Sequence, residues 1–132
     1  MPARTHLDRE AESPLRNTRR VYMDTKKVIN QTSAKIAELN DEHRRNMQGC
    51  TVTKGIVAMG SAANEVFVGV RDYVAFTEDN DPYGEHDFGS LVVAGEKVFW
   101  KIDYYDENLK NWCDPLDSDC QRVLTIMLAE EY

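Results

Sequence analysis

The chain has 132 residues, of which 42% are hydrophobic, and a formal net charge of −7. A chain of this length fits one domain with a buried core, and its apolar runs are far shorter than the ~20 residues of a membrane-spanning helix. The polar N-terminus of mixed charge lacks the apolar segment of a signal peptide, so we expect a cytoplasmic protein without membrane contact.

The three cysteines, Cys50, Cys113 and Cys120, are too scattered for a disulfide framework or a zinc site. We expect them to be reduced thiols in a reducing compartment. The sequence also lacks a phosphate-binding loop, a dinucleotide fingerprint and a nucleophile elbow. We therefore expect no cofactor.

Residues 1–20 are rich in charge, contain two prolines and show no periodic apolar face, which predicts a disordered tail. Residues 21–132 should then form one domain. Residues 21–46 contain neither Pro nor Gly, and a narrow, half-polar stripe of side chains recurs every three or four positions, so we predict a long helix. Ile36 and Leu39 should pack it on the domain, and Gly49 should end the segment. This helix could also join two copies as a homodimer.

Residues 51–59 are rich in β-branched side chains, which predicts a strand. Ser61 is the N-cap candidate of a second helix that should end near Phe76. Its apolar side chains recur at helical spacing. They are Ala63, Val66, Phe67, Val70, Tyr73 and Val74.

The clearest β signal lies in residues 91–93 and 98–104, which flank a four-residue turn at 94–97 that contains Gly95. This pattern predicts a hairpin. Alternation places one set of its side chains on the core, namely Val98, Trp100, Ile102 and Tyr104.

Residues 106–117 read as a polar loop. Ser118 and Gln121 then fit a capping box, which predicts a C-terminal helix over residues 120–128. Its buried stripe would include Val123, Leu124 and Met127. The fold class that follows is α+β, a small single domain with an antiparallel hairpin sheet packed by two or three helices.

The loop at 77–86 and the residue after it concentrate carboxylates, and oxygen ligands of this kind can hold Ca²⁺ or Mg²⁺. Asp79, Asp81 and Gly84 fit positions 1, 3 and 6 of a calcium-binding EF-hand loop. Ser90, however, stands where the pattern requires a glutamate. We therefore assign no metal ligands in this loop.

A small metal-dependent enzyme is the alternative that the sequence leaves open. Hydrolytic sites of that kind combine clustered carboxylates with a metal ion and a bound water. Here His86, Asp87 and Asp103 would carry the chemistry.

Charge points instead to a protein partner. Residues 76–132 hold 14 acidic and 4 basic side chains, a balance that repels nucleic acid and favours basic surfaces. The sequence thus predicts a non-catalytic module that imitates the charge of DNA and occupies the nucleic-acid-binding surface of its target. The expected contact residues are Glu78, Asp79, Asp81, Glu85 and Asp87, supported by Asp103 and Asp106.

From about residue 34 to residue 132 the chain resembles a family of small bacterial proteins catalogued as a domain of unknown function. The motifs that carry the resemblance are KIAELND (35–41), FTEDNDPYGEHDFG (76–89), WKIDYYD (100–106) and RVLTIMLAEEY (122–132). The resemblance implies no reaction. It implies an association with mobile genetic elements, and with it an anti-defence role as an anti-CRISPR or antirestriction inhibitor.

Overall fold

The computed structural model describes residues 31–132, so the predicted tail at 1–20 and the beginning of the predicted helix at 21–30 lie outside the described residues. A helix covers residues 31–46 at the start of the described part. The elements that follow are β1 (Thr51–Val52), α2 (Lys54–Val57), η3 (Gly60–Ala62), α3 (Ala63–Arg71), β2 (Phe88–Val93), β3 (Glu96–Tyr105), β4 (Gln121–Leu128) and η4 (Ala129–Glu131). None of the helices within residues 31–132 has the length and apolarity needed to cross a bilayer.

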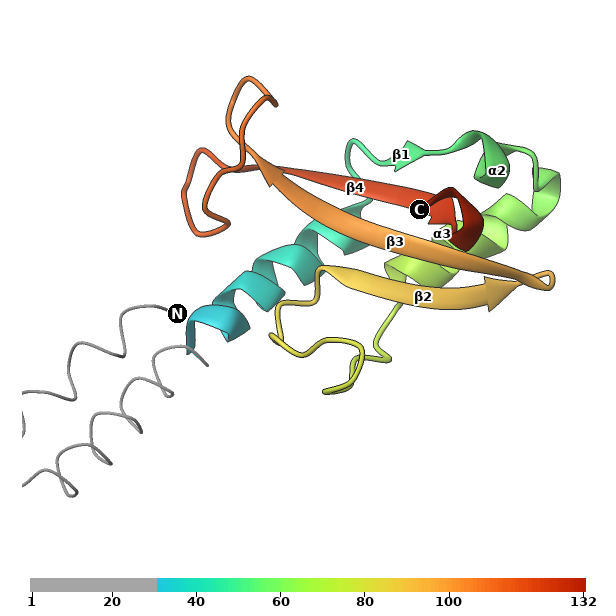
Figure 1. Cartoon of the computed structure of the whole chain (residues 1–132), viewed down its shortest axis with the longest axis horizontal. Coiled ribbons are helices and arrows are strands. Elements are labelled where there is room, and N and C mark those ends of the chain that lie inside the picture. Colours follow the sequence, from blue (N-terminus) through green and yellow to red (C-terminus); the bar gives the residue numbers. More distant parts are fainter. Residues whose placement is uncertain (1–30) are drawn as a thin grey trace, which may run out of the picture.

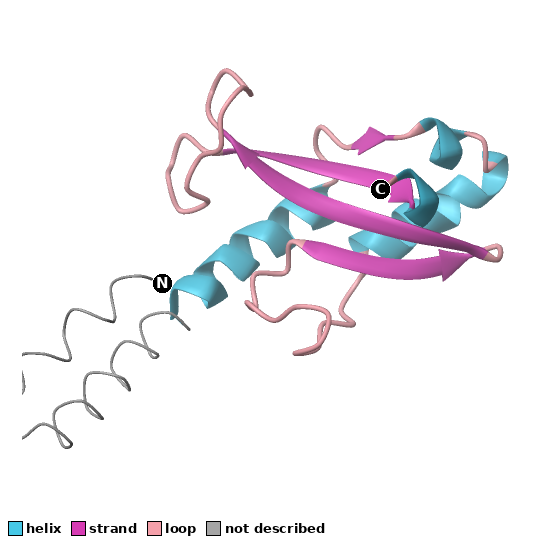
Figure 2. Cartoon of the chain, viewed as in Figure 1, coloured by secondary structure: helices cyan, strands magenta, loops and turns pink. Residues whose placement is uncertain are grey.

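The fold is α+β, as the sequence predicts, with four strands in the order β1-β4-β3-β2 (Figure 1). The pairs β2–β3 and β3–β4 are antiparallel, whereas β1 runs parallel to β4. The sheet is therefore mixed, which corrects the expectation of a purely antiparallel one. Helix 31–46 and α3 cover one face of the sheet, and the polar loops gather at the end of the sheet away from the β2–β3 turn (Figures 1 and 2).

The predicted hairpin is present, but its turn is shorter than expected. Only Ala94 and Gly95 connect β2 to β3, and Glu96 and Lys97 already belong to β3. Both turn residues have positive φ, 52° at Ala94 and 78° at Gly95. Two central residues with positive φ make a type I′ turn, whose twist matches that of the flanking strands.

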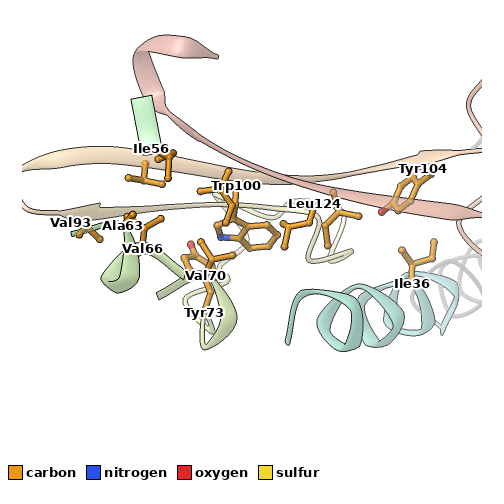
Figure 3. Packing of buried hydrophobic residues seen from close by; sticks show 13 residues of the cluster. Ile36, Ile56, Ala63, Val66, Val70, Tyr73, Val93, Trp100, Tyr104 and Leu124 are labelled. Carbon is orange, nitrogen blue, oxygen red and sulfur yellow. The ribbon is translucent and has the colours of Figure 1, made fainter. Parts of the chain in front are cut away.

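The core lies between the sheet and the helices (Figure 3). The four hairpin side chains predicted to face it are all buried, and Trp100 is fully buried. Gly89 lies directly against this indole, because a Cβ built at Gly89 would come within 2.4 Å of Trp100 Nε1. Ile56, Val66 and Ile126 complete the centre of the cluster.

The predicted C-terminal helix is wrong, because residues 121–128 form strand β4. Val123, Leu124 and Met127 do match a helical spacing, yet Leu124 and Ile126 alternate into the core as strand residues do. Every residue of β4 pairs with β3, from Gln121 opposite Tyr105 to Leu128 opposite Val98. This long-range ladder outweighs the local pattern, and the supposed capping box at Ser118 falls in a turn.

Two further element boundaries differ from the prediction. The expected strand at 51–59 keeps only β1, and residues 54–57 form the short helix α2. The second helix ends at Arg71 instead of Phe76, which leaves Val74 78% exposed. Side-chain hydrogen bonds to the carbonyls of Val70 and Tyr73, described below, satisfy the backbone where α3 ends.

Candidate functional site

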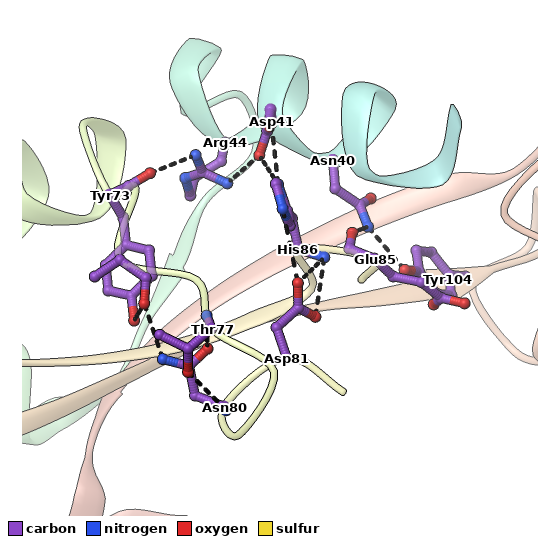
Figure 4. A network of polar contacts seen from close by, with 11 residues as sticks. Asn40, Asp41, Arg44, Tyr73, Thr77, Asn80, Asp81, Glu85, His86 and Tyr104 are labelled. Carbon is purple, nitrogen blue, oxygen red and sulfur yellow. Dashed lines mark hydrogen bonds and ion pairs between the residues drawn. The ribbon is translucent and has the colours of Figure 1, made fainter. Parts of the chain in front are cut away.

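The loops at the polar end of the sheet are fastened to helix 31–46 by a network of buried polar side chains (Figure 4). Arg44, with a side chain only 1% exposed, is its anchor. The guanidinium donates to the carbonyl of Val70 (3.0 Å), to that of Tyr73 (2.9 Å) and to the carboxylate of Asp41 (2.9 Å). Its carbon also lies 5.0 Å from the ring centre of Trp100, a cation–π distance. Arg44 therefore ties helix 31–46 to the end of α3 and to the core.

Asn40, fully buried one helical turn before Arg44, joins three segments that are far apart in the sequence. Its amide donates to the Tyr104 hydroxyl (2.8 Å) and to the backbone carbonyl of Glu85 (2.9 Å). Its carbonyl oxygen accepts from Arg122 Nε (2.7 Å), and Arg122 also donates to the carbonyl of Pro115 (2.7 Å). Both acidic loops, 77–87 and 106–119, are thus held by one buried amide and its neighbour.

His86 closes the first loop against the helix. Its Nδ1 lies 3.0 and 3.1 Å from the two carboxylate oxygens of Asp41, an arrangement in which the ring donates. Its Nε2 lies 3.7 Å from Asp81, whose carboxylate also accepts from the backbone N–H of His86. The imidazole stacks on Phe76 with the ring centres 3.8 Å apart and the planes 2° from parallel. With φ at 55°, His86 holds a sharp backbone bend in place.

The tip of the first loop is ordered by its own side chains. The side-chain oxygen of Asn80, Oδ1, accepts from the backbone N–H of Thr77 (2.8 Å). In return, the Thr77 hydroxyl accepts from the backbone N–H of Asn80 (3.2 Å). The two residues between them, Glu78 and Asp79, are exposed at this fixed tip.

The second acidic loop is organised in the same way. The Asp106 carboxylate accepts from the backbone N–H groups of Asn108 and Lys110, both at 3.1 Å, and these bonds lower the pKa of Asp106. Asp114 and Asp117 each accept from a backbone N–H two residues further on. Trp112 is 70% exposed in this loop and forms an isolated bridge with Tyr105.

Between the two loops, carboxylates are held closer together than is electrostatically favourable. Burial raises the pKa of Glu85, and the charges of Asp87, Asp81 and Asp114 raise it further. Burial likewise raises the pKa of Asp87, with added repulsion from Asp81 and Asp103. We call the end of the sheet formed by loops 77–87 and 106–119 the acidic end. Its loops contain Glu78, Asp79, Asp81, Glu85, Asp87, Asp106, Glu107, Asp114, Asp117 and Asp119, and Asp103 lies beside them on β3.

The predicted contact residues thus lie at one end of the molecule but differ in what they do. Glu78 and Asp79 are exposed, and Glu85 and Asp87 are partly exposed. The Asp81 side chain, in contrast, is only 6% exposed and supports His86 from inside. Two others serve local structure, since Asp103 pairs with Lys101 (2.9 Å) on the outer face of β3 and Asp106 caps its own loop.

Two of the residues of the metal-dependent alternative, His86 and Asp103, contact charged side chains of the fold. The two ring nitrogens of His86 face Asp41 and Asp81, and Asp103 faces Lys101. Among residues 31–132 no three His, Cys, Asp or Glu side chains are grouped so as to hold a metal ion. The three cysteines are free thiols, and Cys120 Sγ lies 3.9 Å from Arg122 Nη1. His86 and Asp103 thus both make local contacts within the acidic end.

Sequence reasoning placed Tyr104 in the core but missed its role in the frame, and it missed the other frame residues, namely Asn40, Asp41, Arg44 and Arg122. A signal for two of them was present. Asn40 and Arg44 follow the buried Ile36 at intervals of four, so they continue its stripe toward the core. A polar residue on such a stripe must find buried partners.

Comparison with known proteins places the chain in a family. No curated protein and no solved structure matches it. A family described as "Protein of unknown function (DUF3768)" matches residues 52–131, which include both acidic loops and the whole β2–β3–β4 sheet. The match covers more than half of the chain, and the protein therefore belongs to the DUF3768 family.

Proposed function

We propose that the protein is a non-catalytic, cytoplasmic binding module whose acidic end docks on a basic, nucleic-acid-binding surface of a protein partner. The observation that carries the proposal is the placement of Glu85 and Asp87, whose pKa values are raised by burial and by neighbouring carboxylates. Such an arrangement costs stability in the free protein. A cationic partner would neutralise the repulsion between the carboxylates, and the free energy released in this way would contribute to binding.

The frame under this surface supports a role in imitating nucleic acid. A mimic must hold its charges at fixed positions, because the phosphates of DNA are regularly spaced. Asn40 holds the first acidic loop and its neighbour Arg122 holds the second, through bonds to the carbonyls of Glu85 and Pro115. The paired bonds of Thr77 and Asn80 fix the tip of the first loop. Preorganised charge loses little entropy on binding.

The finer form of the proposal concerns the partner. The resemblance given above implies mobile elements and an anti-defence role, so we propose a CRISPR or restriction complex as the target. Such complexes carry Lys- and Arg-lined channels for nucleic acid, which complement the acidic end in charge.

Charge reversal at the exposed tip tests the proposal. The double variant Glu78→Lys, Asp79→Lys should lose at least tenfold in binding, because both side chains are exposed and form no hydrogen bond or ion pair with the other residues of 31–132. The matched control is Glu65→Lys, Glu96→Lys, which changes the net charge equally at the opposite end of the molecule. Thermal unfolding of each variant verifies that the fold is intact.

The measurement is capture on tagged protein from a lysate of a bacterium with active defence systems, washed at about 50 and about 300 mM salt. We expect a nucleic-acid-binding complex that is retained at low salt, lost at high salt and released by added duplex DNA or guide RNA. Equal binding by the tip variant and the wild type would contradict the proposal. So would a captured complex that nucleic acid does not displace.

A further inference from the structure

Strand β2 leaves one edge of the sheet open within the described residues. The ladder with β3 includes the bond from the Ile102 N–H to the Asp87 carbonyl (2.8 Å). Because hydrogen-bonded and non-hydrogen-bonded pairs alternate in antiparallel strands, Gly89, Leu91 and Val93 bond to β3. Phe88, Ser90 and Val92 therefore direct their backbone N–H and C=O groups outward. No residue between 31 and 132 bonds to these outward groups.

This edge carries none of the features that normally protect an open strand. Its sequence, FGSLVV, contains no charged residue and no proline, and its register with β3 is regular, without a bulge. Val92 is 69% exposed at the edge of a protein with a net charge of −7. Open edges of this length and composition pair readily with another strand.

We propose that β2 is a dimer interface, at which two copies of the chain pair their β2 strands antiparallel about a two-fold axis at Ser90. The outward-facing residues fix this register. Ser90 lies opposite the partner's Ser90, and Phe88 lies opposite the partner's Val92. Each of these is a hydrogen-bonded pair, in which the two residues exchange two backbone hydrogen bonds. All outward N–H and C=O groups of Phe88, Ser90 and Val92 are therefore satisfied. The sheets of the two copies become one continuous sheet.

The side chains suit this register. Phe88, Ser90 and Val92 share the outer face of the sheet with Phe99 and Lys101 of the neighbouring strand. Pairing sets the Phe88 ring against the partner's exposed Val92, an aromatic and β-branched combination that is favourable across strands. No charged side chain of β2 opposes another, because the strand has none.

The distribution of charge favours antiparallel over parallel pairing of the two copies. The acidic end adjoins the beginning of β2, and the Ala94–Gly95 turn adjoins its end. Antiparallel pairing aligns Asp87 of one copy with the partner's Val93, so the two Asp87 residues are separated along the strand by about 20 Å. That distance exceeds the screening length of about 8 Å at physiological salt. Parallel pairing would instead place both acidic ends side by side.

Sedimentation equilibrium of the full chain tests the assignment. We expect a mass of twice 15.1 kDa for the wild type at about 100 μM, a concentration at which even weak specific dimers form. Val92→Lys places a charge at the edge and should give the mass of a single chain. Ser90→Pro should do the same, since Ser90 donates no bond to β3 and an edge strand tolerates such a proline. Gln121→Lys is the control, with the same charge change on β4.

A cysteine pair tests the register. In a hydrogen-bonded pair of antiparallel strands the two Cα atoms lie about 5.5 Å apart, which permits a disulfide. Ser90→Cys should therefore give a disulfide-linked dimer under mild oxidation at least tenfold faster than Val92→Cys, whose counterpart is Phe88. A single-chain mass for the wild type overturns the proposal. A dimer that persists in Val92→Lys and Ser90→Pro also overturns it and moves the contact elsewhere, with helix 31–46 as the first place to look.

Discussion

At the scale of single residues, the most consequential side chain is Arg44. Its guanidinium is buried, yet it has a carboxylate, two backbone carbonyls and two aromatic rings as partners. Burying a charged group in the low-dielectric interior costs free energy unless its hydrogen-bond donors all find partners. Here the partners come from helix 31–46, from the end of α3 and from β3. The same residue therefore sets the distance between the helices and fixes the exit of the chain into the first acidic loop.

Replacing Arg44 should be strongly destabilising. Arg44→Met preserves most of the apolar stem but leaves the Tyr73 carbonyl without a donor and removes one donor each from Asp41 and the Val70 carbonyl. We expect a loss of about 3 kcal/mol or more in the free energy of unfolding. Urea denaturation followed by circular dichroism measures it. The neighbouring Arg45 is exposed, so Arg45→Met should change the stability by less than about 0.5 kcal/mol. Equal losses in the two variants would contradict this role.

The candidate site was only partly predictable from the residues. Acidic composition was sufficient to find Glu78 and Asp79, because exposed charge needs no partner. It could not separate them from Asp81, which has the same chemistry but lies inside the loop against His86. That distinction depends on Asp41, which is distant in the sequence and comes close only through the packing of helix 31–46.

At the scale of elements, the hairpin was predictable and β4 was not. Strand β3 alternates strictly over Val98–Tyr104 between apolar core residues and outward side chains, a local signal that needs no other information. In β4, Leu124, Ile126 and Met127 are all buried, because η4 and Tyr132 shelter part of the outer face beside Phe99. Burial on both faces removes the alternation and leaves a pattern that also fits a helix. Residues 121–128 form a strand and not a helix because they pair with β3. A short stretch of sequence does not contain this long-range pairing.

The β2–β3 turn makes a prediction at the same scale. Ala94 has a φ of 52°, which a side chain with a Cβ adopts at a cost, whereas asparagine is the residue most often found there in type I′ turns. Ala94→Asn should therefore raise the free energy of unfolding by roughly 0.5–1 kcal/mol. Gly95→Ala, at a φ of 78°, should lower it by about 1 kcal/mol. Thermal and urea unfolding measure both, and changes of the same sign would contradict the turn assignment.

At the scale of the whole molecule, the uneven distribution of charge makes stability depend on pH. Burial and like charges raise the pKa of Glu85 above 4.5 and that of Asp87 above 3.8. Between pH 7 and those usual values, these two carboxyls bind more protons in the folded chain than in the unfolded chain, so their contribution to stability rises as the pH falls. Burial lowers the pKa of His43, so the contribution of this residue falls below about pH 6.5. Hydrogen bonds lower the pKa of Asp106 and Glu131, and the stability that they contribute is lost below about pH 4.

We therefore expect Glu85 and Asp87 to destabilise the folded chain less at mildly acidic pH than at pH 7. Asp87→Asn removes part of the repulsion and should raise the free energy of unfolding at pH 7 by roughly 0.5–1 kcal/mol, while it flattens the rise on acidification. Asp79→Asn, at the exposed loop tip, should change neither quantity appreciably. Urea unfolding between pH 4 and pH 8 provides the measurement. The same pH dependence of stability in the wild type and in Asp87→Asn would contradict the electrostatic description of the acidic end.

The positions of the two tryptophans give this end of the molecule an optical reporter. Trp100 is fully buried, whereas Trp112 is 70% exposed among the carboxylates of loop 106–119. Dissolved quenchers therefore reach Trp112 and not Trp100. Because the surrounding negative potential attracts caesium and repels iodide, the ratio of quenching by these two ions measures the local field in the native chain, without a label or a substitution. A partner that covers the acidic end would change this ratio and shield the same indole.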